Sequence, residues 1–183
     1  MESIQLGKIM GTTITAKMPA LLSTLLLWLI FGAAGYLLFD LSAAAAIGGG
    51  LIAAVLHWLS DLLHQLGHVR AARRTGWSMQ RLHFHWFLIA SLYPRDEPEL
   101  PASIHVRRAL GGLPVSLLLS LAGYLLMLAL QPAGGLPLLL SQFFFWENLL
   151  VFGLGALLPL GFTDGSTLIK WLPRVRQERQ QRG

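Results

Sequence analysis

Four long, mainly apolar runs constrain the fold of this chain more than any other feature of its sequence. A helix that crosses the hydrocarbon core of a bilayer needs about 20 mainly apolar residues. Four stretches are this long, at about 19–39, 43–68, 109–130 and 136–160. Only 13% of all residues are charged, against about 25% in a typical soluble domain. We therefore expect an all-α membrane protein, built as a bundle of about four transmembrane helices.

The placement of the 14 lysines and arginines predicts how these helices are oriented. Two precede the first run, seven lie within 70–108 and five within 170–182. The turns that connect the runs, near residue 40 and at 131–135, contain none. Because basic residues favour the cytoplasmic side of a membrane, all three clusters and both termini are expected in the cytoplasm. Membrane topology thus accounts for the net charge of +5, and we expect no nucleic-acid partner.

Two segments outside the apolar runs are typical of β-strands. Residues 9–18, IMGTTITAKM, are rich in threonine and isoleucine. Residues 81–86, RLHFHW, alternate between apolar and polar side chains with a period of two. We expect a small cytoplasmic β element beside the bundle, with residues 1–183 forming one domain. A metal pair at His83 and His85 is an alternative on this second strand, but a single strand offers no third ligand, which favours a solvated edge.

A stripe of polar residues follows one face of the second run. His57, Asp61, His64, Gln65 and His68 occupy positions i, i+4, i+7, i+8 and i+11 of the predicted helix. A charged side chain at the centre of a bilayer costs about 2.5–3.5 kcal/mol on insertion scales. Such residues usually face the interior of a bundle and mark a functional site. The stripe therefore indicates function more strongly than isolated histidines in a soluble helix would.

His64 and His68 are candidate metal ligands, since a spacing of four places both imidazoles on one helix face. The chain has no cysteine, so further ligands must be histidine or carboxylate, and a zinc site needs at least a third protein ligand. Asp164 follows the fourth run, at a depth similar to that of the histidine pair. The alternative is that Asp164 and Gly165 form an ordinary turn. In zinc metalloproteases the residue after the first histidine is a glutamate that acts as general base, whereas here it is Gln65.

Several segments together resemble the site-2 proteases, which are intramembrane zinc metalloproteases. HQLGH at 64–68 is similar to the HExxH motif of that family, and ALLPLGFTDG at 156–165 to its NxxPxxxxDG motif. ALGGLPVSLLL at 109–119 resembles the start of a further family helix, and the segment before the first run resembles the family's first strand. The resemblance implies that His64, His68 and Asp164 bind zinc, and that substrates are transmembrane helices of other proteins.

Three polar positions of the family patterns are changed in this chain. Gln65 replaces the glutamate, Ala156 the asparagine of NxxPxxxxDG, and Ser116 a further asparagine. Loss of a general base typically lowers a rate by about 10²–10⁴-fold, whereas residue 65 is not itself a metal ligand. We therefore expect a zinc site with weak or lost turnover. Asp61, one turn before Gln65, is either a substitute base or a residue that orients His64 or His57.

Three functions remain open from the sequence. The first is an intramembrane zinc metallopeptidase of weak or lost activity, with an extended substrate pairing with the strand at 81–86. The second is a catalytically inactive pseudoprotease that binds zinc and membrane-protein partners. The third is a haem or metal-transport bundle, which needs histidines on facing helices. We expect a multi-pass protein of a bacterial cell membrane, in contact with lipid, and we expect Glu147 to pair with a buried polar group such as His57.

Overall fold

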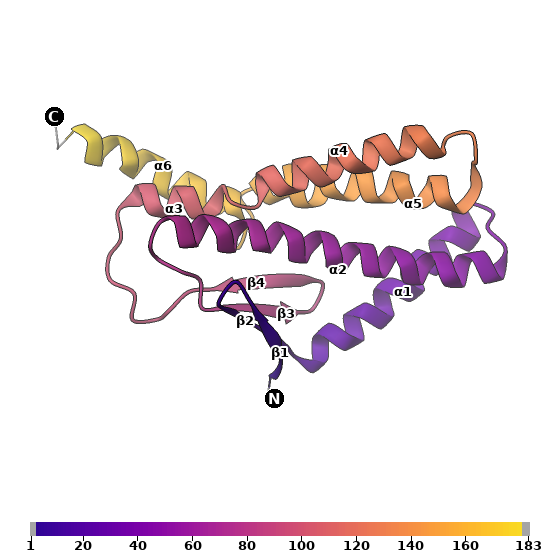
Figure 1. Ribbon diagram of the computed structural model, residues 1–183, viewed down its shortest axis with the longest axis horizontal. Coiled ribbons are helices and arrows are strands. Elements are labelled where there is room, and N and C mark those ends of the chain that lie inside the picture. The colour runs from indigo at the N-terminus through magenta and orange to yellow at the C-terminus, as the bar shows by residue number, and fades with distance from the viewer. Residues whose placement is uncertain (1–2, 181–183) are drawn as a thin grey trace.

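The computed structural model describes residues 3–180 and contains helices and strands in the order shown in Figure 1. The strands are β1 (Ile4–Ile9), β2 (Thr12–Ala16), β3 (Arg81–His85) and β4 (Leu88–Leu92). The α-helices are α1 (Met18–Leu38), α2 (Ala43–Arg74), α3 (Ala102–Ala109), α4 (Leu113–Leu130), α5 (Gly135–Trp146) and α6 (Asp164–Gln180). Between α5 and α6 lie a π-helix, η1 (Glu147–Leu154), and a 3₁₀ turn, η2 (Gly155–Leu157).

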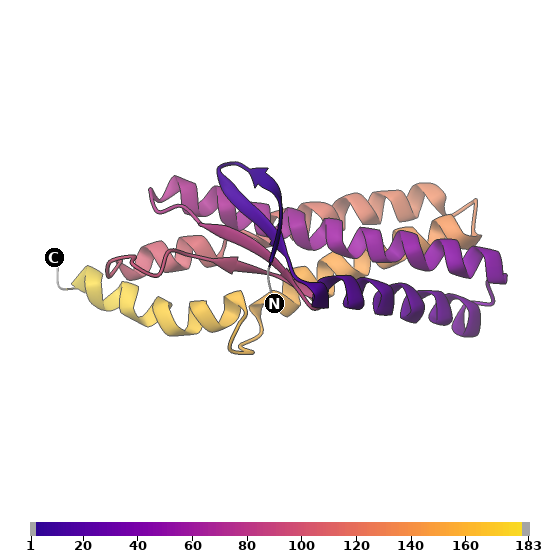
Figure 2. The ribbon, with the colours of Figure 1, turned by 90° about the horizontal axis from the view of Figure 1, so that it is seen from below.

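Four helical segments are long and apolar enough to cross a membrane, namely Met18–Leu38, Ala43–Arg74, Ala102–Leu130 and Gly135–Leu157. The third begins earlier than the expected residue 109, because α3 precedes α4 across a short break at residues 110–112. The fourth ends at Leu157, because Pro159 follows it. Helices α1, α2, α4 and α5 extend together toward one end of the molecule, and the sheet, α3 and α6 lie toward the other end (Figures 1 and 2).

The strands form one sheet in the order β1-β2-β3-β4. Neighbouring strands are antiparallel except for β2 and β3, which run parallel. The expected strand at 9–18 is in fact the end of β1, a turn at Met10–Gly11 with positive φ angles, and β2. The expectation that the strand at 81–86 offers a free edge is wrong, because β3 pairs with β2 on one side and β4 on the other.

The sheet packs against the C-terminal half of α2. Val69 and Ala72 of α2 form a buried cluster with Met79, Leu82 of β3 and Ile89 of β4. Each of these side chains is at most 2% exposed, and burying an apolar side chain of this size typically contributes about 1.5–3 kcal/mol. This cluster fixes the sheet beside the polar stripe of α2.

Candidate metal centre

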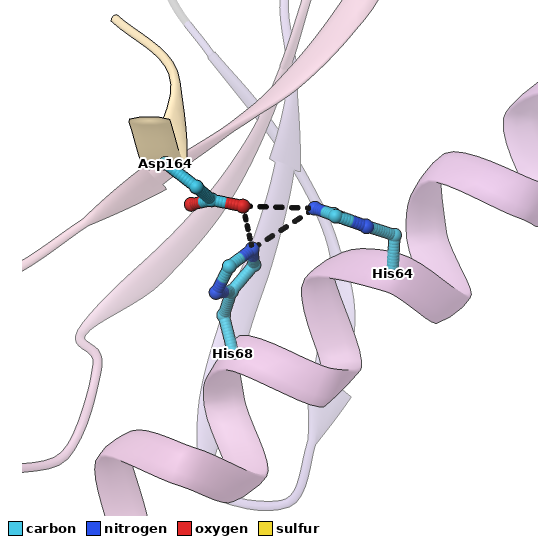
Figure 3. A group of neighbouring side chains, drawn as sticks. All are labelled: His64, His68 and Asp164. Carbon is cyan, nitrogen blue, oxygen red and sulfur yellow. Dashed lines mark hydrogen bonds and ion pairs between the residues drawn. The ribbon is translucent and has the colours of Figure 1, made fainter. Parts of the chain in front are cut away.

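His64, His68 and Asp164 meet at one point, although Asp164 is about 100 residues from the histidines in the chain. The two Nε2 atoms are 3.0 Å apart. Asp164 Oδ2 lies 3.5 Å from Nε2 of His64 and 3.3 Å from Nε2 of His68. Figure 3 shows the three side chains converging from α2 and from the start of α6. Both histidines are buried, so the site lies within the bundle.

The chain brings Asp164 to the histidines through the break that follows the fourth span. Residues 158–163 are not helical, and Gly161 has a φ of +90°. Asp164 then begins α6, where the helix dipole favours a carboxylate. A Cβ on Gly165 would overlap the carbonyl oxygen of Leu157, so glycine lets α6 start close to η2. Burial alone would raise the pKa of Asp164, but the neighbouring imidazoles of His64 and His68 hold it below its usual value.

The other ring nitrogens of both histidines are held by hydrogen bonds. His68 Nδ1 donates to the carbonyl oxygen of Arg108 at 2.8 Å, because a carbonyl can only accept. In the neutral imidazole the Nε2 of His68 is then unprotonated and free to bind a metal. His64 Nδ1 lies 2.8 Å from Ser116 Oγ. Ser116 thus orients one of the two candidate metal-binding histidines. Contacts of this kind fix ring orientation in metal sites.

The arrangement fits a zinc ion. Zinc binds histidine nitrogen and carboxylate oxygen at about 2.0–2.2 Å, and a tetrahedral site then spaces its ligands about 3.3 Å apart. The observed spacings of 3.0–3.5 Å agree with this value. Asp164 Oδ2 is also a buried oxygen without a hydrogen-bond donor among the described residues. Three protein ligands leave a fourth position open, as in catalytic rather than structural zinc sites.

Gly112 keeps the space beside the two imidazoles clear. A Cβ at this position would overlap Cε1 and Nε2 of His64 and Nε2 of His68. Gly112 immediately precedes α4, and Ser116 lies one turn further along the same helix. The ALGGLPVSLLL segment therefore provides both the room for the metal site and one of its hydrogen bonds.

Comparison with known proteins addresses the fold that carries this site. No protein-family model matches the sequence, and no curated protein matches it either. A solved structure, described as the site-2 protease from Methanocaldococcus jannaschii, matches with a TM-score of 0.60 and 21% sequence identity. The match covers 92% of this chain and 70% of that chain. The chain has a site-2 protease-like fold. Together with the four apolar helices, the match supports a multi-pass integral membrane protein.

In this site-2 protease-like fold, the amide of Gln65 is hydrogen-bonded to β4 and not to His64, His68 or Asp164. Its Nε2 donates to the carbonyl oxygen of Ile89 at 2.8 Å, and its Oε1 accepts from the hydroxyl of Ser91. Asp61 Oδ2 accepts from the backbone N–H of Ile89 at 2.6 Å. Among the described residues, Asp61 makes no hydrogen bond to either His57 or His64. The structure thus directs both candidate catalytic side chains toward β4.

The predicted partnership of Glu147 with His57 is confirmed. His57 Nδ1 lies 2.7 Å from Glu147 Oε1, so the two buried groups pair between α2 and η1. Next to them, Asn148 Nδ2 donates to Ser60 Oγ at 2.9 Å. These two contacts fasten the π-helical part of the fourth span to α2.

Sequence reasoning missed the role of Arg108, which appeared as one of several basic residues near the membrane surface. Its side chain is 4% exposed, and its guanidinium binds both carboxylate oxygens of Glu97, at 2.6 and 3.0 Å. It also donates to the carbonyl oxygen of Trp77 at 2.8 Å and lies over the ring of Tyr93. Burial raises the pKa of Tyr93 to about 12. The side chain of Arg108 thereby fixes the backbone whose carbonyl orients His68.

A cavity of about 900 Å³ opens beside the metal residues. Its walls come from α2, from β4 and from the chain between η1 and α6, and include Gln65, Ile89, Phe152 and Asp164. The cavity is large enough to admit several residues of a polypeptide.

The other histidines do not form a second group of three ligands within residues 3–180. His83 Nδ1 lies 2.8 Å from Thr15 Oγ1, and the ring of His83 stacks against that of His85. Burial and the nearby Lys17 lower the pKa of His83. The buried histidines at 57, 64 and 68 all lie on α2. Within residues 3–180, the helices other than α2 carry no buried histidine for the axial pair that the haem interpretation requires.

Proposed function

We propose that this chain is a site-2-protease-like intramembrane zinc metallopeptidase that acts on transmembrane segments, with weak or lost hydrolysis. The observation that carries the proposal is the meeting of His64, His68 and Asp164, with both Nε2 atoms directed at a carboxylate oxygen without a donor. The likeness to a solved site-2 protease supports it. The protein would lie in a bacterial cell membrane, with both termini in the cytoplasm.

Each residue would have a separate role in such a site. His64, His68 and Asp164 would hold the ion, while Ser116 and the carbonyl of Arg108 orient the two imidazoles. Bound zinc supplies Lewis-acid chemistry, which polarises a peptide carbonyl and makes water more acidic. Gln65 has no group that can take a proton, so proton transfer at this position is lost. Oδ2 of Asp61 is engaged by the N–H of Ile89, so a role as base would fall to Oδ1.

The substrate class follows from the position of the cavity. The metal residues are buried in a bundle whose outer surface carries many exposed large apolar side chains, including Leu22, Leu29 and Leu118. A ligand that reaches the cavity from the lipid must itself be compatible with the membrane. A transmembrane helix that unwinds beside the site meets this condition. Lipid would cover the apolar outer surface of the bundle.

A pseudoprotease is the second candidate, and one observation favours it. Both the nitrogen and the oxygen of the Gln65 amide are engaged by β4, in hydrogen bonds to Ile89 and Ser91. In this second function the chain binds zinc and a transmembrane partner without cleaving it.

Cleavage of model single-span substrates in proteoliposomes, with zinc content measured on the same samples, tests both candidates. We expect the wild-type chain and Gln65→Glu to bind zinc and Asp164→Ala to lose it. Because glutamate restores a general base, we expect Gln65→Glu to cleave about 10²–10⁴-fold faster than the wild type. Zinc binding without cleavage by either chain would favour the pseudoprotease. A wild-type chain without zinc would contradict both candidates.

If the wild-type chain cleaves and Asp164→Ala does not, hydrolysis is retained. Asp61 then becomes the first candidate for the missing base. Cleavage that survives in Asp164→Ala would show that the activity does not come from this site.

A further inference from the structure

Three side chains of α2 bind the backbone at the start of β4 in consecutive order. His57 Nε2 donates to the carbonyl oxygen of Phe87 at 2.9 Å. Asp61 accepts from the N–H of Ile89, and Gln65 donates to the carbonyl oxygen of the same residue. We call these three side chains, His57, Asp61 and Gln65, the α2 ladder. Asp61 and Gln65 together bind both the N–H and the carbonyl oxygen of Ile89.

The repeat lengths of a helix and a strand explain why the ladder fits. Residues four apart in an α-helix are about 6 Å apart along its axis. Residues two apart in a strand are about 6.8 Å apart. Side chains at i, i+4 and i+8 of α2 therefore reach Phe87, Ile89 and the hydroxyl of Ser91 in turn. The difference between these two repeat lengths adds up along the ladder. The long side chain of Gln65 compensates for it, because it reaches both Ile89 and Ser91.

The ladder occupies the side of β4 that a further strand would use. Residue Ile89 is opposite Phe84 of β3, and residues of an antiparallel strand direct their backbone groups alternately toward and away from a neighbour. The backbone groups of Ile89 point to α2, so they point away from β3. The turn before β4 is also fastened, because Ser23 of α1 donates to the carbonyl oxygen of Trp86 at 2.6 Å.

We propose that Gln65, with His57 and Asp61, is a positioning residue that holds β4 against α2 in place of a fifth strand. The ladder thereby closes this edge of the sheet to an added peptide strand. Position 65 keeps a definite role in this chain, although it cannot act as a base. A segment that enters the cavity does not gain the backbone groups of Ile89 as hydrogen-bond partners. This proposal goes beyond the proposed function and does not depend on whether the site binds zinc.

Hydrogen–deuterium exchange of the full chain in lipid nanodiscs tests the ladder. Gln65→Met keeps the length of the side chain but removes its hydrogen bonds, and Asp61→Leu removes the acceptor for Ile89. We expect peptides that cover residues 87–92 to exchange about tenfold faster in each variant, since each lost bond favours local opening. Asp61→Asn retains an acceptor oxygen and should restore the wild-type rate. A merely apolar packing role for residue 61 predicts the reverse order of these two variants.

Asp164→Ala is the matched control, because it removes a metal ligand without touching the ladder. We expect it to lose zinc and keep wild-type exchange at 87–92, whereas Gln65→Met should keep zinc and exchange faster there. Ser91→Ala removes the hydroxyl that donates to Gln65 and should give a smaller increase in exchange at 87–92. It replaces Gln65→Met in the test if Gln65→Met does not fold. Unchanged exchange at 87–92 in both Asp61→Leu and Ser91→Ala would overturn the proposal.

A second arm tests the closed edge itself. An octapeptide of alternating threonine and valine is added to the wild-type chain, and exchange is measured again. We expect no added protection at residues 87–92. Protection confined to that segment would show that the edge accepts a strand, and would also overturn the proposal.

Discussion

At the scale of single residues, the candidate metal centre depends on Gly112, which has no side chain. The two imidazoles occupy the space where a Cβ of residue 112 would lie. We predict that Gly112→Ala displaces His64 and His68 and lowers zinc content from one ion per chain to a small fraction. Metal analysis of the purified chain in nanodiscs measures this, with helix content followed by circular dichroism.

Gly48→Ala is the control for that substitution, because a Cβ on Gly48 of α2 would meet no atom within 4 Å. It should leave zinc content unchanged. Full zinc occupancy in Gly112→Ala would mean that the histidine positions do not depend on the contact with α4.

At the scale of elements, two polar contacts of different kinds join α2 to η1. His57 and Glu147 form a buried ionisable pair, whereas Ser60 and Asn148 form a neutral one. Removing one partner of a buried ion pair typically costs about 3–5 kcal/mol, and a neutral contact in a membrane protein averages about 0.6 kcal/mol. We predict that Glu147→Leu lowers the free energy of unfolding several times more than Ser60→Ala does. Equilibrium unfolding in mixed micelles measures both.

The double variant His57→Leu with Glu147→Leu separates the pair from its surroundings. It should cost less than the sum of the single variants, because neither partner is then left unpaired. Additive losses would show that His57 and Glu147 stabilise the protein independently, for example through the contact of His57 with Phe87.

The sequence predicted an element well where its hydrophobic pattern extends over many residues, and poorly where the pattern is short. Apolar runs of about 20 residues located all four helical spans, and the spacing of His64 and His68 indicated the pair that the structure brings together with Asp164. The five-residue strand LIASL of β4 has too few alternations to be distinguished from a loop. Arg108 escaped notice because its partner Glu97 lies in a loop eleven residues away. No periodicity connects the two residues, so burial and pairing appear only in three dimensions.

At the scale of the whole molecule, the structure separates the polar parts of the chain from the turns of the bundle. The sheet, α3 and α6 lie toward one end, and the turns between α1 and α2 and between α4 and α5 lie toward the other (Figure 1). The basic residues of 70–108 and 170–176 lie on or near the first group of elements. Because basic residues are retained in the cytoplasm, this arrangement predicts that the metal centre opens nearer the cytoplasmic face.

The absence of cysteine from the chain makes this orientation directly measurable. Single cysteines are introduced at the exposed positions Arg95, Lys170 and Ala133, of which the last lies in the turn after α4. A membrane-impermeant maleimide should label Arg95→Cys and Lys170→Cys only in inside-out vesicles, and Ala133→Cys only in right-side-out vesicles. The same pattern at all three positions would contradict a single crossing between Ala133 and each of the other two positions. A fully reversed pattern would retain the bundle but place the sheet and the metal centre toward the outer face.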